Sequence, residues 1–313
     1  MAVDILGADW AAREIPLEAD EEGAVIATLV HRPGRPKHRR AVLYIHGFVD
    51  YFFQTQMAEN CERQGYDFYA LDLRKYGRSL LPHQTPNYCT DLAVYDAELD
   101  EAVRIIRQER GAATLVVHAH STGGLIAPLW LNRRPGTADA LVLNSPWFDL
   151  NGSLFERTLG TWLLYLVGQG APRMRVGKLA DHYGKSLHVS SGGAWDYDLA
   201  LKPLEGFPVR AGWIRAIRLG HRQLARGLHL DCPVLICTSS RSGPHDRWHD
   251  ALDRTDSVLN VAHMAERAAG LARVVTLARI EDGIHDLALS AQPARDAYFA
   301  EITRWTSAYV PPA

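Results

Sequence analysis

A serine at the apex of a predicted tight turn is the residue of this chain best placed to act as a nucleophile. Residues 115–120 form a nearly apolar run typical of a buried strand, and residues 125–131 have the composition of a helix. Ser121 lies between them, with the small residues Ala119 and Gly123 two positions away on either side. A strand, a sharp turn at serine and a helix form the arrangement that holds a serine hydroxyl out as a nucleophile.

A serine hydroxyl needs a base within hydrogen-bond reach, and the chain offers one near its C-terminus. Residues 274–280 read as a strand, and His285 lies in the loop that follows it. An acid that could orient this histidine, Asp256, lies between the two in sequence. The order serine, acid, histidine is one of three chain orders in which this set of groups occurs.

The choice of acid is open among four aspartates. Asp246, Asp250 and Asp253 belong to a polar stretch after a predicted strand, and Asp256 follows them. We favour Asp256 because it directly precedes residues 257–261, which we expect to begin a helix, and a helix N-terminus stabilises a carboxylate.

These motifs resemble those of the α/β-hydrolase superfamily, and within it the branch of monoacylglycerol lipases, lysophospholipases and serine-aminopeptidase-like hydrolases. The resemblance rests on the turn at residues 119–123, the pair His46–Gly47 after an apolar run, and the Asp-x-Arg-x-x-Gly-x-Ser loop at residues 72–79. It extends from about residue 22 to residue 310 and is weakest over 151–227. Ala119 stands where the family usually has glycine, which keeps the requirement for a small residue.

The resemblance implies roles for individual residues. Ser121 would be the nucleophile, His285 the general base and Asp256 the acid that orients it. The backbone N–H groups of Phe48 and Thr122 would form the oxyanion hole, which stabilises the negative charge of the tetrahedral intermediate.

Three further histidines near these motifs have other expected roles. His118 and His120 precede Ser121 too closely to present a ring from the opposite side, so we expect His118 in the buried strand and His120 beside the nucleophile. We expect His46 to shape the oxyanion loop.

The resemblance and the order of predicted elements imply an α/β fold, a doubly wound, mainly parallel sheet with an inserted helical cap. We expect the core in residues 1–150 and 228–313 and the cap in residues 151–227. The predicted strands cover residues 22–31, 41–45, 66–71, 115–120, 140–144, 233–237 and 273–280, and the predicted helices include 51–64 and 91–110.

The cap segment is rich in large apolar residues at roughly helical spacing, among them Trp162 and Trp213. Most of them are expected to attach the cap to the core. A minority would line an apolar acyl pocket above Ser121.

Composition narrows the function classes. The chain has 313 residues with 34 basic and 36 acidic side chains and no long basic run, so nothing indicates nucleic-acid binding. Neither a signal peptide nor a membrane span is expected, and the four cysteines lack metal-ligand spacing, which together indicate a cytoplasmic protein with free thiols. His245 and His249 lie in a polar loop, and we expect solvated surface there rather than a metal site. We expect neither a metal nor a cofactor.

The sequence therefore predicts a carboxylic ester hydrolase acting on a lipophilic acyl ester of the monoacylglycerol or lysophospholipid type. An amidase or aminopeptidase with the same triad is the first alternative, because the same groups cleave esters and amides. A non-catalytic ligand receptor on a hydrolase scaffold is the second. The physiological substrate, the acyl length and the oligomeric state stay open.

Overall fold

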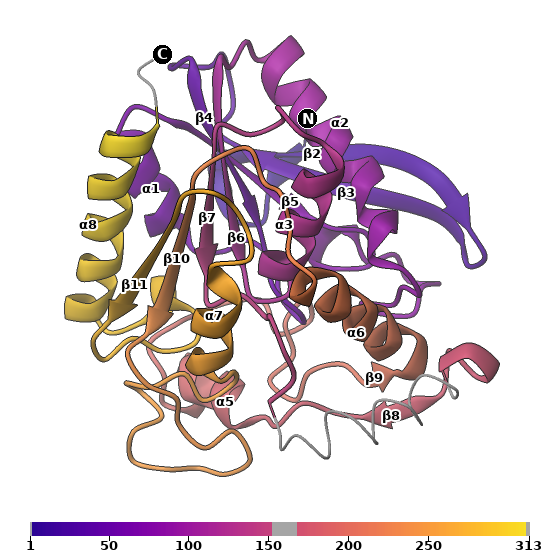
Figure 1. The fold of residues 1–313 in the computed structure, drawn as a ribbon. Coiled ribbons are helices and arrows are strands. Elements are labelled where there is room, and N and C mark those ends of the chain that lie inside the picture. Colours follow the sequence, from indigo (N-terminus) through magenta and orange to yellow (C-terminus); the bar gives the residue numbers. More distant parts are fainter. Residues whose placement is uncertain (1, 152–167, 311–313) are drawn as a thin grey trace.

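A computed structural model describes residues 2–151 and 168–310, shown in Figure 1. A nine-stranded sheet runs through this part of the chain in the order β1-β2-β3-β5-β4-β6-β7-β10-β11. Its strands are β1 (Ala2–Asp4), β2 (Gly7–Asp20), β3 (Gly23–His31), β4 (Arg40–Ile45), β5 (Asp67–Asp72), β6 (Thr114–His120), β7 (Ala140–Asn144), β10 (Val234–Ser239) and β11 (Val275–Ile280).

The sheet is mainly parallel, as predicted. All neighbouring pairs from β5 to β11 are parallel, whereas β1, β2 and β3 form an antiparallel edge next to β5. Every residue of β6, β7 and β10 is buried, which explains their nearly uninterrupted apolar runs. The strand β2 was not predicted.

Helices cover both faces of the sheet, and the side chains of β4 alternate between two apolar cores. Leu43 and Ile45 belong to the core that contains residues of α2 (Asp96–Arg104), α3 (Gly123–Arg133), α6 (Ala211–Ala225) and α7 (Val261–Ala268). Val42 and Tyr44 belong to the core on the other face, with residues of α1 (Thr55–Arg63) and α8 (Gln292–Tyr309). Figure 1 shows α1 and α8 on one side and α2, α3 and α6 on the other. This is the doubly wound α/β-hydrolase fold.

The helix predicted over residues 91–110 is divided into three parts. It consists of the short turn η2 (Leu92–Tyr95), α2, and a π-helical turn, η3 (Ile105–Glu109). In the described residues there are further short helical turns, η1 (Gly77–Ser79), η5 (Val189–Ser191) and η6 (Leu287–Leu289).

The segment predicted as a cap is described from residue 168 onward. It contains β8 (Arg175–Gly177) paired with β9 (Val209–Arg210), then α5 (His182–Leu187), and Figure 1 shows these elements beyond the carboxyl ends of β10 and β11. The helix α6 differs, since its Trp213 and Ile217 join the main apolar core with α3. Trp162, one of the predicted pocket residues, lies outside the described residues. The boundaries of the cap stay a prediction.

Two further sequence expectations bear on the chain as a whole. All four cysteines are buried and free of disulfides. Within residues 2–151 and 168–310, no helix has the length and apolar character needed to cross a membrane.

Candidate active site

Ser121 lies in a sharp turn between β6 and α3, as its flanking residues predicted. Its φ is 51°, a left-handed conformation that a non-glycine residue adopts only where its surroundings impose it. A Cβ at Gly123 would lie 2.4 Å from the carbonyl oxygen of His46, and one at Gly124 would lie 2.7 Å from Cβ of Pro146. The two glycines therefore allow the start of α3 to pack closely against neighbouring backbone, which leaves Ser121 at the apex of the turn.

His285 lies within hydrogen-bond distance of both of its predicted partners. Its Nε2 is 3.0 Å from the Oγ of Ser121, and its Nδ1 is 3.0 Å from Oδ2 of Asp256. The loop after β11 positions the histidine, while the long loop after β10 positions the aspartate. Residues far apart in sequence thus meet at the carboxyl edge of the sheet, where parallel α/β proteins form their sites.

Asp256 is the aspartate that the structure places beside His285. Its side chain is fully buried, whereas Asp246, Asp250 and Asp253 are exposed. The remaining oxygen, Oδ1, accepts hydrogen bonds from the backbone N–H groups of Val258 at 3.0 Å and Leu259 at 2.8 Å. A carboxylate with both oxygens engaged is fixed in orientation.

The helix expected to start at Ser257 starts later. Helix α7 begins at Val261, with the side chain of Asn260 accepting from Ala262 N–H as its N-cap. Asp256 is therefore stabilised by the N–H groups of a tight turn and not by the first turn of a helix. The Asp-x-Val sequence favours this turn because an aspartate readily accepts from N–H groups two and three residues on.

The backbone groups predicted as the oxyanion hole belong to residues that line the same cavity as Ser121. Thr122 directly precedes α3, and Phe48 lies on the loop after β4. On that loop Val49 has a φ of 50°. As expected, His46 shapes the loop: one ring nitrogen bonds the carbonyl of Gly47 at 2.8 Å, and the other accepts from Leu73 N–H at 3.0 Å.

His118 and His120 also lie where the sequence placed them. His118 is buried in β6 against the hydroxyl of Tyr298 at 2.7 Å, and burial lowers its pKa to about 4. The ring of His120 lies 4.9 Å from that of His285, centroid to centroid, and burial lowers its pKa as well. Both are therefore neutral histidines near neutral pH.

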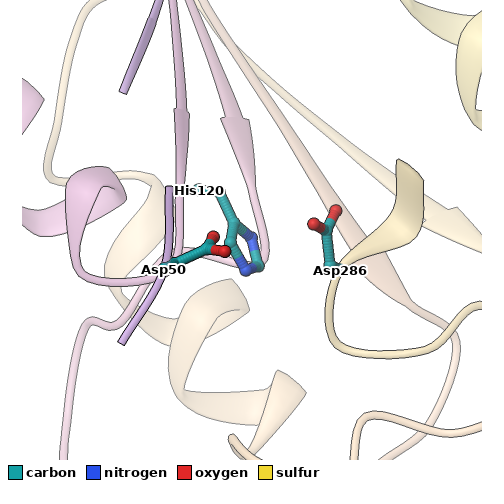
Figure 2. A group of neighbouring side chains, drawn as sticks. All are labelled: Asp50, His120 and Asp286. Carbon is teal, nitrogen blue, oxygen red and sulfur yellow. The ribbon is translucent and has the colours of Figure 1, made fainter. Parts of the chain in front are cut away.

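A cluster of Asp50, His120 and Asp286 beside the candidate triad was not predicted, and Figure 2 shows the three side chains. One potential ligand atom from each lies within 4.8 Å of the others, a spacing compatible with a metal ion. The Asp286 oxygens, however, accept from the side-chain amides of Asn144 at 2.8 Å and Gln54 at 2.9 Å.

The third member of this cluster, Asp50, pairs with an amino group. Lys202 Nζ lies 2.5 Å from Asp50 Oδ1. Burial alone would raise the pKa of Asp50, but the positive charge of Lys202 holds it below its ordinary value. Since a lysine and two amides already engage these carboxylates, the donor set fits a hydrogen-bonded charge cluster better than a metal site.

A cavity of about 320 Å³ opens over Ser121 and His285. Its wall is mostly apolar and is contributed by both the core loops and residues 179–214, including Phe48, Trp147, Leu204, Val209, Trp213 and Ile214. Phe48 and Trp213 stack with ring centroids 4.0 Å apart. Of the two tryptophans named from the sequence, Trp213 thus lines the cavity.

The sequence contained little that would have identified Asp50, Asp286 and Lys202. Asp286 follows the predicted base directly, and Asp50 lies four residues after His46, so both belonged to loops already selected. Lys202 is 152 residues from Asp50 and lies in no motif.

Comparison with known proteins shows the family of the chain. Residues 36–288 match a protein family described as serine aminopeptidase, S33. The chain belongs to this family. A relative with a curated description is lysophospholipase L2 of Escherichia coli K12, which is 30% identical over 154 residues. That match covers 45% of this chain and 42% of the relative, so it spans less than half of either protein.

Solved structures with the same fold align over nearly the whole S33 chain. A soluble variant of monoglyceride lipase from Saccharomyces cerevisiae, solved with a substrate analogue, has a TM-score of 0.70, 14% identity and 96% coverage of both chains. The monoacylglycerol lipase of Paleococcus ferrophilus has a TM-score of 0.62 and 14% identity, with 96% of this chain and 99% of that one covered. At this identity the likeness establishes the fold.

Proposed function

We propose that the protein is a serine hydrolase that cleaves carboxylic esters with a lipophilic acyl group, of the monoacylglycerol or lysophospholipid type. The observation that carries this proposal is the line of contacts from Asp256 through His285 to Ser121, each 3.0 Å long, at the floor of a largely apolar cavity. The relatives named as a lysophospholipase and as monoacylglycerol lipases support the same class.

The first half of the reaction acylates the serine. His285 Nε2 removes the Ser121 proton as Oγ attacks the ester carbonyl, and Asp256 stabilises the imidazolium that forms. The N–H groups of Thr122 and Phe48 donate to the oxyanion, each contributing about 3 kcal/mol to lowering the barrier. The carbon–oxygen bond of the ester then breaks, and His285 gives its proton to the departing alcohol.

The second half releases the acid. Water attacks the acyl-enzyme while His285 takes a proton from it, and the collapse of the second intermediate returns that proton to Ser121. The product is the free carboxylic acid.

The lining of the cavity favours esters over aminoacyl substrates. An aminopeptidase needs an unpaired carboxylate for the substrate ammonium group. Among the described residues that line the cavity the acids are Asp50 and Glu205, and each is paired with a lysine, Lys202 at 2.5 Å and Lys178 at 2.8 Å.

We also propose a cytoplasmic location. The four cysteines are buried and unpaired, which supports a reducing compartment.

A substrate panel tests the choice between ester and amide. We expect turnover of p-nitrophenyl esters to rise from acetate to an intermediate acyl length, and leucine and alanine p-nitroanilides to react at least about 100-fold more slowly. Ser121→Ala protein serves as the control for uncatalysed ester hydrolysis. Comparable turnover of the anilides would identify an aminopeptidase instead.

A further inference from the structure

The loop that carries Phe48 is held in a conformation that its own sequence disfavours. Val49, a β-branched residue, has a φ of 50°, and such a residue occupies this region only when its surroundings impose it. On one side the loop is held by the stacking of Phe48 on Trp213. Its position therefore depends on contacts from outside the loop.

Asp50 supplies a second contact, at the end of the loop. Its Oδ2 lies 3.4 Å from the backbone nitrogen of Gly47, which closes residues 47–50 into a turn. The carboxylate is only 2% exposed, and the cavity wall contains it together with Ser121. A buried carboxylate so near the predicted oxyanion hole would repel the negative charge of the transition state unless a cation neutralised it.

Lys202 is that cation, and it is held firmly. Its Nζ lies 2.5 Å from Asp50 Oδ1 and sits 5.2 Å from the ring centre of Phe53 and 5.5 Å from that of Tyr197. The backbone N–H of Lys202 donates to Asp198, whose own N–H donates to the hydroxyl of Tyr51 at 2.8 Å. The lysine is thus anchored by its side chain and by its backbone.

We propose that Lys202 is a positioning residue for ester hydrolysis: by neutralising Asp50, it lets the carboxylate hold the oxyanion loop without opposing the oxyanion. The inference rests on the proposed function. It makes the segment around Lys202 part of the reaction machinery, in addition to its place in the cavity wall. Lys202 acts through Asp50 and touches neither the ester nor Ser121 in this account.

A double-mutant cycle on the full chain tests the proposal with p-nitrophenyl acetate, whose acyl group is too short to depend on the rest of the cavity. Lys202→Met removes the charge and keeps most of the side-chain length. We expect kcat to fall at least about tenfold with KM changed less than about threefold, because the unneutralised Asp50 would repel the oxyanion, which is present in the transition state and absent from the bound ester. Lys202→Arg, which keeps the charge, should restore kcat to within about threefold of the natural protein.

The second arm of the cycle removes the partner. Asp50→Asn keeps an oxygen for Gly47 N–H and removes the negative charge, so adding Lys202→Met to it should change kcat less than about twofold. In each variant kcat is calculated per active site titrated with a fluorophosphonate, so that any unfolded Lys202→Met protein does not lower the measured value. Lys185→Met is the matched control, since Lys185 forms a surface pair with Asp181 at 2.7 Å and neither residue lines the cavity, and its kcat should equal that of the natural protein.

Two results would overturn the inference: a kcat for Lys202→Met within twofold of the Lys185→Met control, or an equal loss from Lys202→Met with and without Asp50→Asn. Either result would leave the proposed function intact as long as Ser121→Ala abolishes acetate hydrolysis. If Ser121→Ala does not, the proposed function itself fails.

Discussion

Two parts of the candidate site place different demands on the sequence. The floor consists of the turn at Ser121 together with His285 and Asp256, and the wall consists of the apolar side chains around the cavity. On the floor, each position accepts few residue types: a Cβ at Gly123 would collide with backbone, and Asp256 has both oxygens engaged. In the wall, residues such as Leu204 and Ile214 need only apolar bulk. We therefore expect the residues of the floor to carry out the reaction and the residues of the wall to determine which ester is preferred. This division predicts effects of decreasing size from floor to wall.

The largest effect is expected for the acid. Asp256→Asn should lower kcat for a short ester by about 10³- to 10⁴-fold, because the amide no longer holds the histidine in the tautomer that accepts the serine proton. Asp246→Asn, Asp250→Asn and Asp253→Asn are matched controls on exposed side chains and should stay within twofold. Steady-state measurement of kcat for all four proteins tests this assignment. A large loss of kcat in one of the controls, together with nearly unchanged kcat in Asp256→Asn protein, would contradict it.

The second-largest effect is expected from a steric change in the floor. Gly123→Ala places a Cβ 2.4 Å from the His46 carbonyl oxygen, so the turn at Ser121 and the oxyanion loop must separate. We expect a loss of about 3 kcal/mol or more in the free energy of unfolding, together with a large loss of activity. Gly170→Ala is the control, since a Cβ there meets nothing within 4 Å. Denaturant unfolding measures both, and equal stability of the two variants would refute this reading of the turn.

Acid should destabilise the protein through His118. Its pKa is lowered from 6.5 to about 4, so between these values the unfolded chain binds a proton that the native protein does not. The stability is complete above pH 6.5 and declines as pH falls toward 4, by about 3 kcal/mol from this residue.

Unfolding free energies measured between pH 7 and pH 4 check this. His118→Gln should reduce the slope of the unfolding free energy against pH by roughly the amount that corresponds to the binding of one proton. His229→Gln, on an exposed histidine, should leave it unchanged. An unaltered slope in His118→Gln protein would show that His118 does not titrate as described.

The smallest effect is expected in the wall. Trp213 lines the cavity and stacks on Phe48, so Trp213→Leu should change the ratio of kcat/KM between octanoate and acetate esters by about tenfold. Trp248→Leu removes an exposed tryptophan and should leave the ratio unaltered. Equal losses on both esters in Trp213→Leu protein would indicate a folding defect and no role in substrate choice.

The same division explains which parts of the structure were predictable. The buried strands β4, β6, β7 and β10 were recognised because a strand covered on both faces must be apolar along its length. The strand β2 was missed because most of its residues are not buried, so it has no apolar run.

At the site, local patterns predicted Ser121, Asp256 and His285 as candidates, and the structure brings the three side chains together. The start of α7 was placed four residues early because the turn at Asp256 mimics a helix N-terminus. The contact between Lys202 and Asp50 was not predictable, since it joins residues 152 positions apart in different loops and depends on how the chain folds back over the site.

The most direct test of the central claim is covalent labelling of the folded protein with a fluorophosphonate, followed by peptide mass spectrometry. We predict one equivalent of phosphonate on Ser121, formed at least about 100-fold more slowly in His285→Ala protein because the base is missing. We also predict no label in Ser121→Ala protein. Label on another residue, or undiminished label in Ser121→Ala protein, would contradict the assignment of Ser121 as the nucleophile.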